Sequence, residues 1–92
     1  MLQIESRDHQ ILKQILSKYP YKFYAYGSRA KGTARKFSDL DLCYQEDIPD
    51  PTISQIQAEL EESDLSFVVE LVSWKLMRVT FREIVKKDLI VL

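Results

Sequence analysis

Both glycines of this 92-residue chain, Gly27 and Gly32, lie in one short basic segment between two strand-like segments. Glycine permits tight reversals that other residues resist, so the backbone is expected to turn sharply here. Two carboxylates, Asp39 and Asp41, follow directly, where the next strand begins. Elsewhere the apolar residues follow the periodicities of ordinary helices and strands. The residues that are free to perform chemistry are therefore concentrated in the segment 27–42.

The periodicities predict an α/β (α+β) fold in the order helix, strand, short helix, strand, helix, strand, helix. The expected elements are a helix over Ile4–Tyr19 capped by Ser6 or Asp8, strands at 22–26, 38–45 and 66–72, helices that start at the capping boxes Thr52-x-x-Gln55 and Thr80-x-x-Glu83, a short turn at 74–77, and an edge strand or packed tail at 89–92. We expect one domain, residues 1–92, with helices packed on one face of a small mixed sheet.

Side chains alternate between the two faces of a strand, and this separates the acids from the core. In the second strand Leu40, Leu42 and Tyr44 should face the helices, and Asp39, Asp41 and Cys43 the opposite, open side. Glu70 stands between Val69 and Leu71 in an apolar strand. A carboxylate is costly to bury, so Glu70 needs solvent, a cation or a partner. The last helix is expected to hold Phe81, Ile84 and Val85 toward the core.

Composition narrows the classes of function. Thirteen Lys and Arg against fourteen Asp and Glu give a net charge of −1, which argues against a nucleic-acid binder with a strongly basic surface. The single cysteine, Cys43, forms no intramolecular disulfide and is expected to be a buried, inert thiol. The N-terminal segment lacks the apolar region of a signal peptide, and no apolar run approaches membrane-spanning length. We therefore expect a cytoplasmic protein.

Three acids and a glycine turn suit phosphoryl-transfer chemistry. Oxygen ligands are what Mg²⁺ takes, and two Mg²⁺ ions roughly 3.5–4 Å apart can hold the attacking and leaving oxygens of an in-line displacement. Asp39 and Asp41 would hold the metals, while Glu70 would assist the metal that activates the acceptor hydroxyl or act as its general base. Gly27 and Ser28, at the start of the short helix, would bind the terminal phosphates. A lone Asp-x-Asp is also common on solvated strand edges.

Cations near the glycines complete the candidate site. Arg29, Lys31 and either Arg35 or Lys36 would offset the charge of bound phosphates, although each is equally well explained as a solvated side chain. The candidate nucleotide-binding residues are therefore Gly27, Ser28, Arg29 and Lys31, beside the candidate metal ligands and catalytic acids Asp39, Asp41 and Glu70.

The motif resembles a known signature. Gly27-Ser28, ten residues, and then Asp39-Leu40-Asp41 match the G-S-x10-D-x-D pattern of the DNA-polymerase-beta-like nucleotidyltransferase superfamily. The wider segment is similar to the minimal nucleotidyltransferase branch. Val69-Glu70-Leu71 resembles the strand that carries the family's third acid, with glutamate where that branch usually has aspartate, and Phe81-Arg82-Glu83-Ile84 resembles its closing helix.

The resemblance implies a nucleotidyltransferase fold and transfer of AMP from Mg·ATP to a hydroxyl, with pyrophosphate leaving. Many minimal members resemble the antitoxin of a toxin–antitoxin module, which adds AMP to a tyrosine of an all-helical HEPN ribonuclease. The length of the chain agrees, because 92 residues leave no room for an acceptor-binding domain. Two alternatives remain: an antitoxin that acts by binding alone, and a small-molecule nucleotidyltransferase of the aminoglycoside-modifying type.

Overall fold

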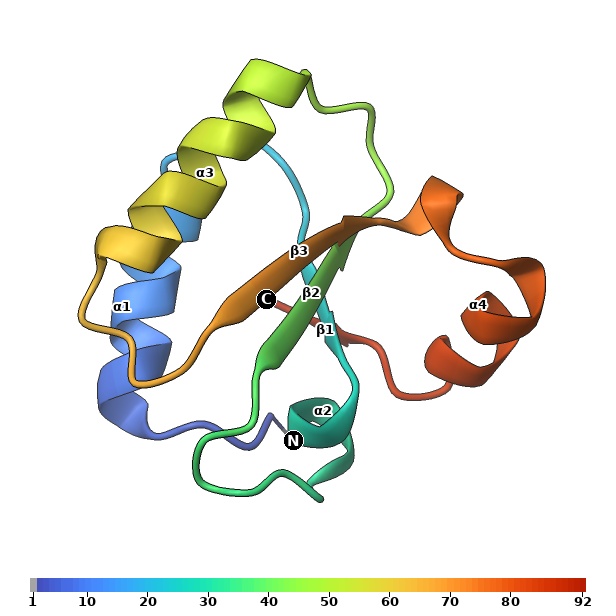
Figure 1. The fold of residues 1–92 in the computed structure, drawn as a ribbon, viewed down its shortest axis with the longest axis horizontal. Coiled ribbons are helices and arrows are strands. Elements are labelled where there is room, and N and C mark those ends of the chain that lie inside the picture. Colours follow the sequence, from blue (N-terminus) through green and yellow to red (C-terminus); the bar gives the residue numbers. More distant parts are fainter. Residues whose placement is uncertain (1) are drawn as a thin grey trace.

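Four strands form one mixed sheet in the order β3-β2-β1-β4 (Figure 1). The computed structural model describes residues 2–92. The strands are β1 (Tyr24–Tyr26), β2 (Leu40–Tyr44), β3 (Val69–Ser73) and β4 (Ile90–Val91). β1 pairs antiparallel with β2 and β4, whereas β2 and β3 are parallel. The mixed α/β fold predicted from the sequence is confirmed, and residues 89–92 contribute an edge strand.

Two long helices lie side by side on one face of the sheet (Figure 1). They are α1 (Ser6–Leu16) and α3 (Asp50–Glu62), and α3 is the crossover that connects the parallel strands β2 and β3. Their buried side chains pack on those of the strands, and the main core consists of Leu12, Ile15, Leu16, Phe23, Ala25, Leu40, Leu42, Ile48, Ile56, Leu60 and Val69. The predicted alternation of β2 is correct, because Leu40 and Leu42 are both fully buried on this face.

The opposite face is only partly open. A 3₁₀ turn, η1 (Trp74–Leu76), and the short helix α4 (Val79–Val85) lie over one end of it. There Tyr26, Cys43, Met77 and Val85 form a second, smaller core. On this face Asp39 and Glu70 remain exposed.

The helix starts differ from the predicted ones. α1 begins after Glu5, α3 after Pro49 and α4 after Arg78, and none of these three residues makes a side-chain capping bond. Thr52 and Thr80, the predicted caps, therefore lie inside their helices. In α3 the reason is Pro51: proline fits the first turn of a helix, so the helix starts two residues before Thr52.

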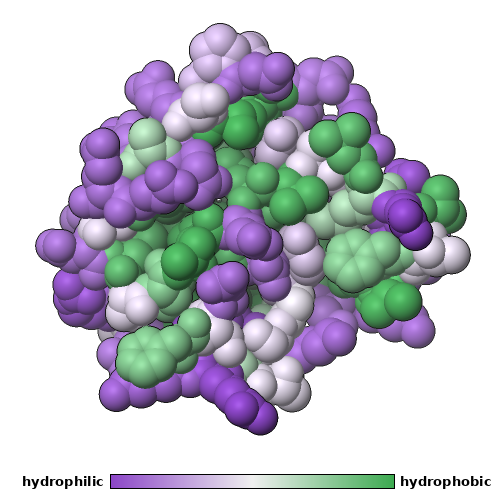
Figure 2. All heavy atoms as spheres, viewed as in Figure 1, coloured by the Kyte–Doolittle hydropathy of each residue, from purple (hydrophilic) through white to green (hydrophobic). Residues whose placement is uncertain are grey.

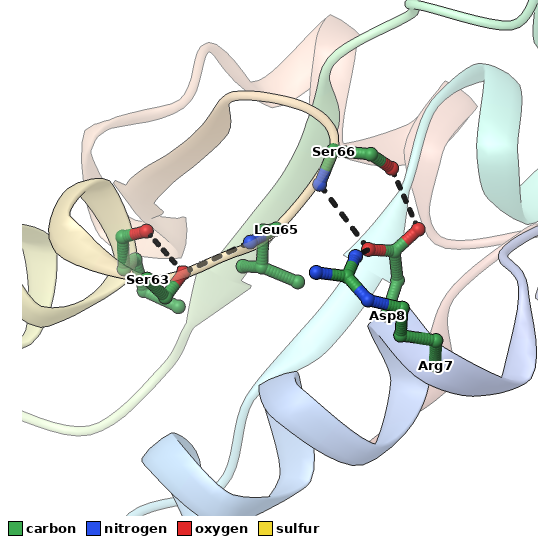
Figure 3. A network of polar contacts seen from close by, with 6 residues as sticks. Arg7, Asp8, Ser63, Leu65 and Ser66 are labelled. Atoms are coloured by element: carbon green, nitrogen blue, oxygen red, sulfur yellow. Dashed lines mark hydrogen bonds and ion pairs between the residues drawn. The ribbon is translucent and has the colours of Figure 1, made fainter.

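Asp8 ties α1 to the segment that precedes β3 (Figure 3). Its carboxylate accepts bonds from the backbone N–H of Ser66 at 3.2 Å and from the Ser66 hydroxyl at 2.7 Å. The side chain is buried, and Arg7 approaches it at 3.6 Å. Asp8 is thus a long-range structural link and not the N-cap of α1.

No helix of the described residues, 2–92, is long and apolar enough to cross a membrane.

Candidate active site

Asp41 lies at the centre of the candidate site, on β2, which is flanked by β1 and β3. Its Cα is paired with that of Tyr26 across β1 and with that of Glu70 across β3. Paired residues of adjacent strands project from the same face of a sheet, so the side chains of Asp41 and Glu70 are neighbours there. The parallel pairing through α3 thus brings together two acids that are far apart in the sequence.

Gly27 lets the turn approach the Asp41 carboxylate closely. A Cβ at position 27 would lie 2.5 Å from the Asp41 Oδ2 atom, far inside van der Waals contact. The backbone also has a φ of +77° there, a conformation that L residues rarely adopt. Gly32 has a similar φ of +79°, but a Cβ there would meet nothing within 4 Å. The first glycine is therefore required by the site and the second only by the turn.

The acids have no counterion from the protein. Among the described residues, no ion pair with lysine or arginine involves Asp39, Asp41 or Glu70. Burial raises the pKa of Asp41 above its ordinary value, and the charges of Glu70 and Asp39 raise it further. Asp39, one residue before β2, and Glu70 are both exposed. The site thus concentrates negative charge on an accessible surface.

This donor set fits Mg²⁺, which prefers carboxylate oxygens and keeps several water ligands. Within residues 2–92, however, no three His, Cys, Asp or Glu side chains are arranged so that they could hold a metal ion as they stand. The chemistry of the donors fits the metal, but the arrangement of these residues in the structure forms no cluster of three metal ligands.

The short helix α2 (Ser28–Lys31) follows the glycine turn directly. The Gly27 carbonyl accepts the bonds from Ala30 and Lys31, at 3.1 and 3.0 Å, so the N–H groups of Ser28 and Arg29 have no partner within the helix. Gly27 is the N-cap residue, and no side chain caps α2. Lys31 is exposed at the end of this helix. The turn thus places the start of α2 beside Asp41 and an exposed cation at its end.

Arg29 has a different role from the predicted one. Only 6% of its surface is exposed, and its guanidinium stacks 4.2 Å from the centre of the Phe67 ring. It donates hydrogen bonds to the backbone carbonyls of Ser38, Gln3 and Lys36, at 2.9, 2.9 and 3.3 Å. The prediction that this cation is available to phosphates is therefore wrong. Arg29 instead fixes the loop that leads from α2 to Asp39.

Two further side chains border the site. Cys43 is fully buried, so the expectation of a buried thiol is confirmed, and burial raises the pKa of this thiol to about 11. Sequence reasoning missed Tyr26, which packs beside Asp41. Burial, followed by the charges of Asp41, Cys43 and Glu70, raises the pKa of Tyr26 to about 12, so its hydroxyl stays neutral. Its position one residue before Gly27 is the sequence feature that could have placed Tyr26 near the site. Its proximity to Asp41 follows only from the pairing of β1 with β2.

The sequence model of the family described as polymerase beta, nucleotidyltransferase matches residues 10–92. The chain belongs to this nucleotidyltransferase family. It is also 37% identical over 95 residues to a protein of Haemophilus influenzae named probable protein adenylyltransferase MntA, in an alignment that covers 99% of this chain and 83% of that protein. This nucleotidyltransferase thus has the fold and the type of enzymatic activity that its motif predicted.

Proposed function

We propose that this nucleotidyltransferase transfers AMP from Mg·ATP to a hydroxyl of a protein partner. The proposed acceptor is a tyrosine of a HEPN-type helical ribonuclease toxin, for which this chain is the antitoxin. The observation that carries the proposal is the pairing of half-buried Asp41 with exposed Glu70 beside the Gly27 turn, where no lysine or arginine of residues 2–92 forms an ion pair with either acid. The similarity to a protein named as a probable protein adenylyltransferase supports a protein acceptor.

The chain's own residues would divide the work as follows. Asp39, Asp41 and Glu70 would hold the metal ions. The backbone at Gly27 and Ser28, together with the Lys31 ammonium, would bind the departing phosphates. Two Mg²⁺ ions, when bound, supply charge that stabilises the attacking and leaving oxygens of the displacement.

The reaction balances without any other reactant. The acceptor oxygen forms a bond to the α-phosphorus of ATP, and the bond from that phosphorus to the bridging oxygen of the β-phosphate breaks. Pyrophosphate leaves with that oxygen. The acceptor proton passes to the Glu70 carboxylate, which is exposed and can release it to water. Because the reaction uses ATP, we also propose a cytoplasmic location.

The test uses the protein encoded by the neighbouring open reading frame as the acceptor. This chain, Mg·ATP and that protein are incubated together, and the partner's intact mass and ribonuclease activity are then measured. The proposal expects a mass gain of AMP units, mapped by tandem mass spectrometry to a tyrosine, and a loss of ribonuclease activity that requires ATP. Replacing that tyrosine by phenylalanine should abolish the gain.

Two results would contradict the proposal. Inhibition that is equally strong without ATP, with an unchanged partner mass, would show an antitoxin that acts by binding alone. A mass gain on a small aminoglycoside and none on the protein would show a small-molecule enzyme. Asp39→Ala provides the matched control, because this exposed residue can be replaced without disturbing the core and should still abolish the gain.

A further inference from the structure

The turn η1 and the helix α4 carry large apolar side chains that the fold leaves exposed. Leu76 is 83% exposed, Val79 65% and Ile84 59%, and Phe81 is also exposed. We call these four residues the α4 surface. Figure 2 shows hydrophobic atoms gathered over the part of the molecule where Figure 1 shows α4. The prediction that Phe81 and Ile84 point into the core is wrong, because only Val85 of α4 is buried.

The α4 surface is continuous with the active site. The ring of Phe81 meets the ring of Tyr26 edge to face, with their centroids 6.1 Å apart. Tyr26 is in turn paired with Asp41 across the sheet. Only the Tyr26 side chain therefore separates a molecule bound over Phe81 from Asp41, the candidate metal ligand.

Charge indicates what kind of molecule this is. Residues 74–88 hold five basic side chains and two acidic ones, on a chain whose net charge is −1. Of the basic residues, Lys75 and Lys86 are already paired with Asp47 and Glu83. A two-fold dimer through this surface would bring two basic segments together, so a second copy of the chain is a poor occupant. A partner with acidic residues around an apolar centre is complementary.

We propose that the α4 surface is the docking site of the protein acceptor, and that the acceptor presents apolar side chains flanked by aspartate or glutamate. This inference rests on the proposed function for the identity of the acceptor. It adds where the acceptor binds: on η1 and α4, with its reactive hydroxyl directed past Phe81 toward Asp41.

The experiment compares matched aspartate substitutions. Val79→Asp and Ile84→Asp place an acid on the α4 surface, while Val91→Asp makes the same change at a residue of β4 that is 57% exposed. Binding of the neighbouring-gene protein and of Mg·ATP is measured by calorimetry, AMP transfer by intact mass, and folding by circular dichroism. A fourth variant, Lys87→Glu, reverses one exposed charge without touching the apolar residues.

The proposal expects Val79→Asp and Ile84→Asp to weaken partner binding at least tenfold and to leave ATP binding unchanged. Val91→Asp should bind like the wild type, and Lys87→Glu should weaken binding several-fold, less so at high salt. Binding within twofold of wild type by the first two variants would overturn the proposal. An equal loss of partner binding in Val91→Asp would also overturn it. The same holds if the chain binds vesicles of anionic phospholipid in a way that depends on Val79 while partner binding is intact, because the α4 surface would then bind a membrane.

The two proposals fail in different ways. Docking that depends on Val79 and Ile84, without any AMP transfer, would refute the proposed reaction and leave the docking site. AMP transfer that all four variants perform at the wild-type rate would refute the docking site and leave the reaction.

Discussion

The close approach of Gly27 to Asp41 can be tested with a pair of glycine variants. Gly27→Ala and Gly32→Ala both place an L residue at a positive φ, +77° and +79°, but ψ is −158° at Gly27, a region that is essentially restricted to glycine, and 21° at Gly32, in the left-handed helical region. The left-handed helical region at Gly32 costs an L residue about 1–2 kcal/mol, and the reduced entropy of the unfolded chain returns about 0.4–1 kcal/mol. Gly32→Ala should therefore be destabilised by roughly 1 kcal/mol, which lowers the Tm of a chain of this size by about 4–8 °C, and Gly27→Ala should be destabilised more.

The two variants should differ in activity. A Cβ at Gly27 would lie 2.5 Å from the Asp41 Oδ2 atom, whereas ordinary contacts begin at 3.4 Å, so the carboxylate must move by about 1 Å. A carboxylate at the end of a side chain can rotate away at little cost in stability, but a misplacement of that size in a catalytic group lowers rates by about 100-fold. At Gly32 the new methyl group meets nothing within 4 Å.

Thermal denaturation followed by circular dichroism gives the stability, and pyrophosphate release gives the rate of transfer. We expect a lower Tm for Gly27→Ala than for Gly32→Ala and, at a temperature where circular dichroism shows both variants folded, a rate for Gly27→Ala that is about 100-fold below that of Gly32→Ala. If both variants transfer nucleotide within threefold of each other, the close approach has no catalytic role and the reasoning is refuted.

Three further predictions concern single side chains. The pKa of Asp41 is raised above 3.8 in the folded state, so protonation of Asp41 stabilises the fold at low pH, and this stability is lost as the pH rises from about 4 through the raised pKa. In EDTA, Asp41→Asn should therefore have a higher Tm than the wild type at neutral pH and the same Tm near pH 3. Added Mg²⁺ should stabilise only the wild type. Glu70→Gln should lose most turnover while calorimetry still detects ATP binding, and full activity would remove Glu70 from the mechanism. Arg29→Lys should lower the Tm by more than about 8 °C, because a lysine cannot replace the planar guanidinium that hydrogen-bonds three backbone carbonyls at the same time. Lys31→Ala should leave the Tm unchanged and raise the KM for ATP. The opposite pattern would show that Arg29 binds phosphate and Lys31 stabilises the fold.

The sequence alone predicts the elements of this fold well where the apolar spacing is regular. The faces of β1, β2 and β3 follow from alternation, and the stripe of α1 that buries Leu12, Ile15 and Leu16 follows from its helical period. The helix starts could not be predicted in the same way. Both Thr-x-x-Gln and Thr-x-x-Glu fit a capping box, yet α3 starts before Pro51, which fits the first turn of a helix, and α4 starts directly after Arg78.

The candidate site was predictable in its residues and unpredictable in its surroundings. The acids and the glycine turn are local motifs, so spacing was enough to select Asp39 and Asp41. The roles of Arg29 and Tyr26 depend on contacts with distant residues, and no local pattern distinguishes a guanidinium that bonds carbonyls from one that awaits a phosphate. For the same reason the exposure of α4 follows from how little of the sheet it covers, which its sequence does not encode.

The central claim is that Asp39 and Asp41 catalyse a metal-dependent transfer of AMP to a protein. The most direct test is the intact mass of the neighbouring-gene protein after incubation with ATP and either the wild-type chain or the double variant Asp39→Ala, Asp41→Ala, each with Mg²⁺ and with EDTA. The account predicts a mass gain of AMP units for the wild type with Mg²⁺ and no gain in the other three samples. A gain that persists in the double variant, or an unmodified partner that the wild type binds tightly, would contradict it.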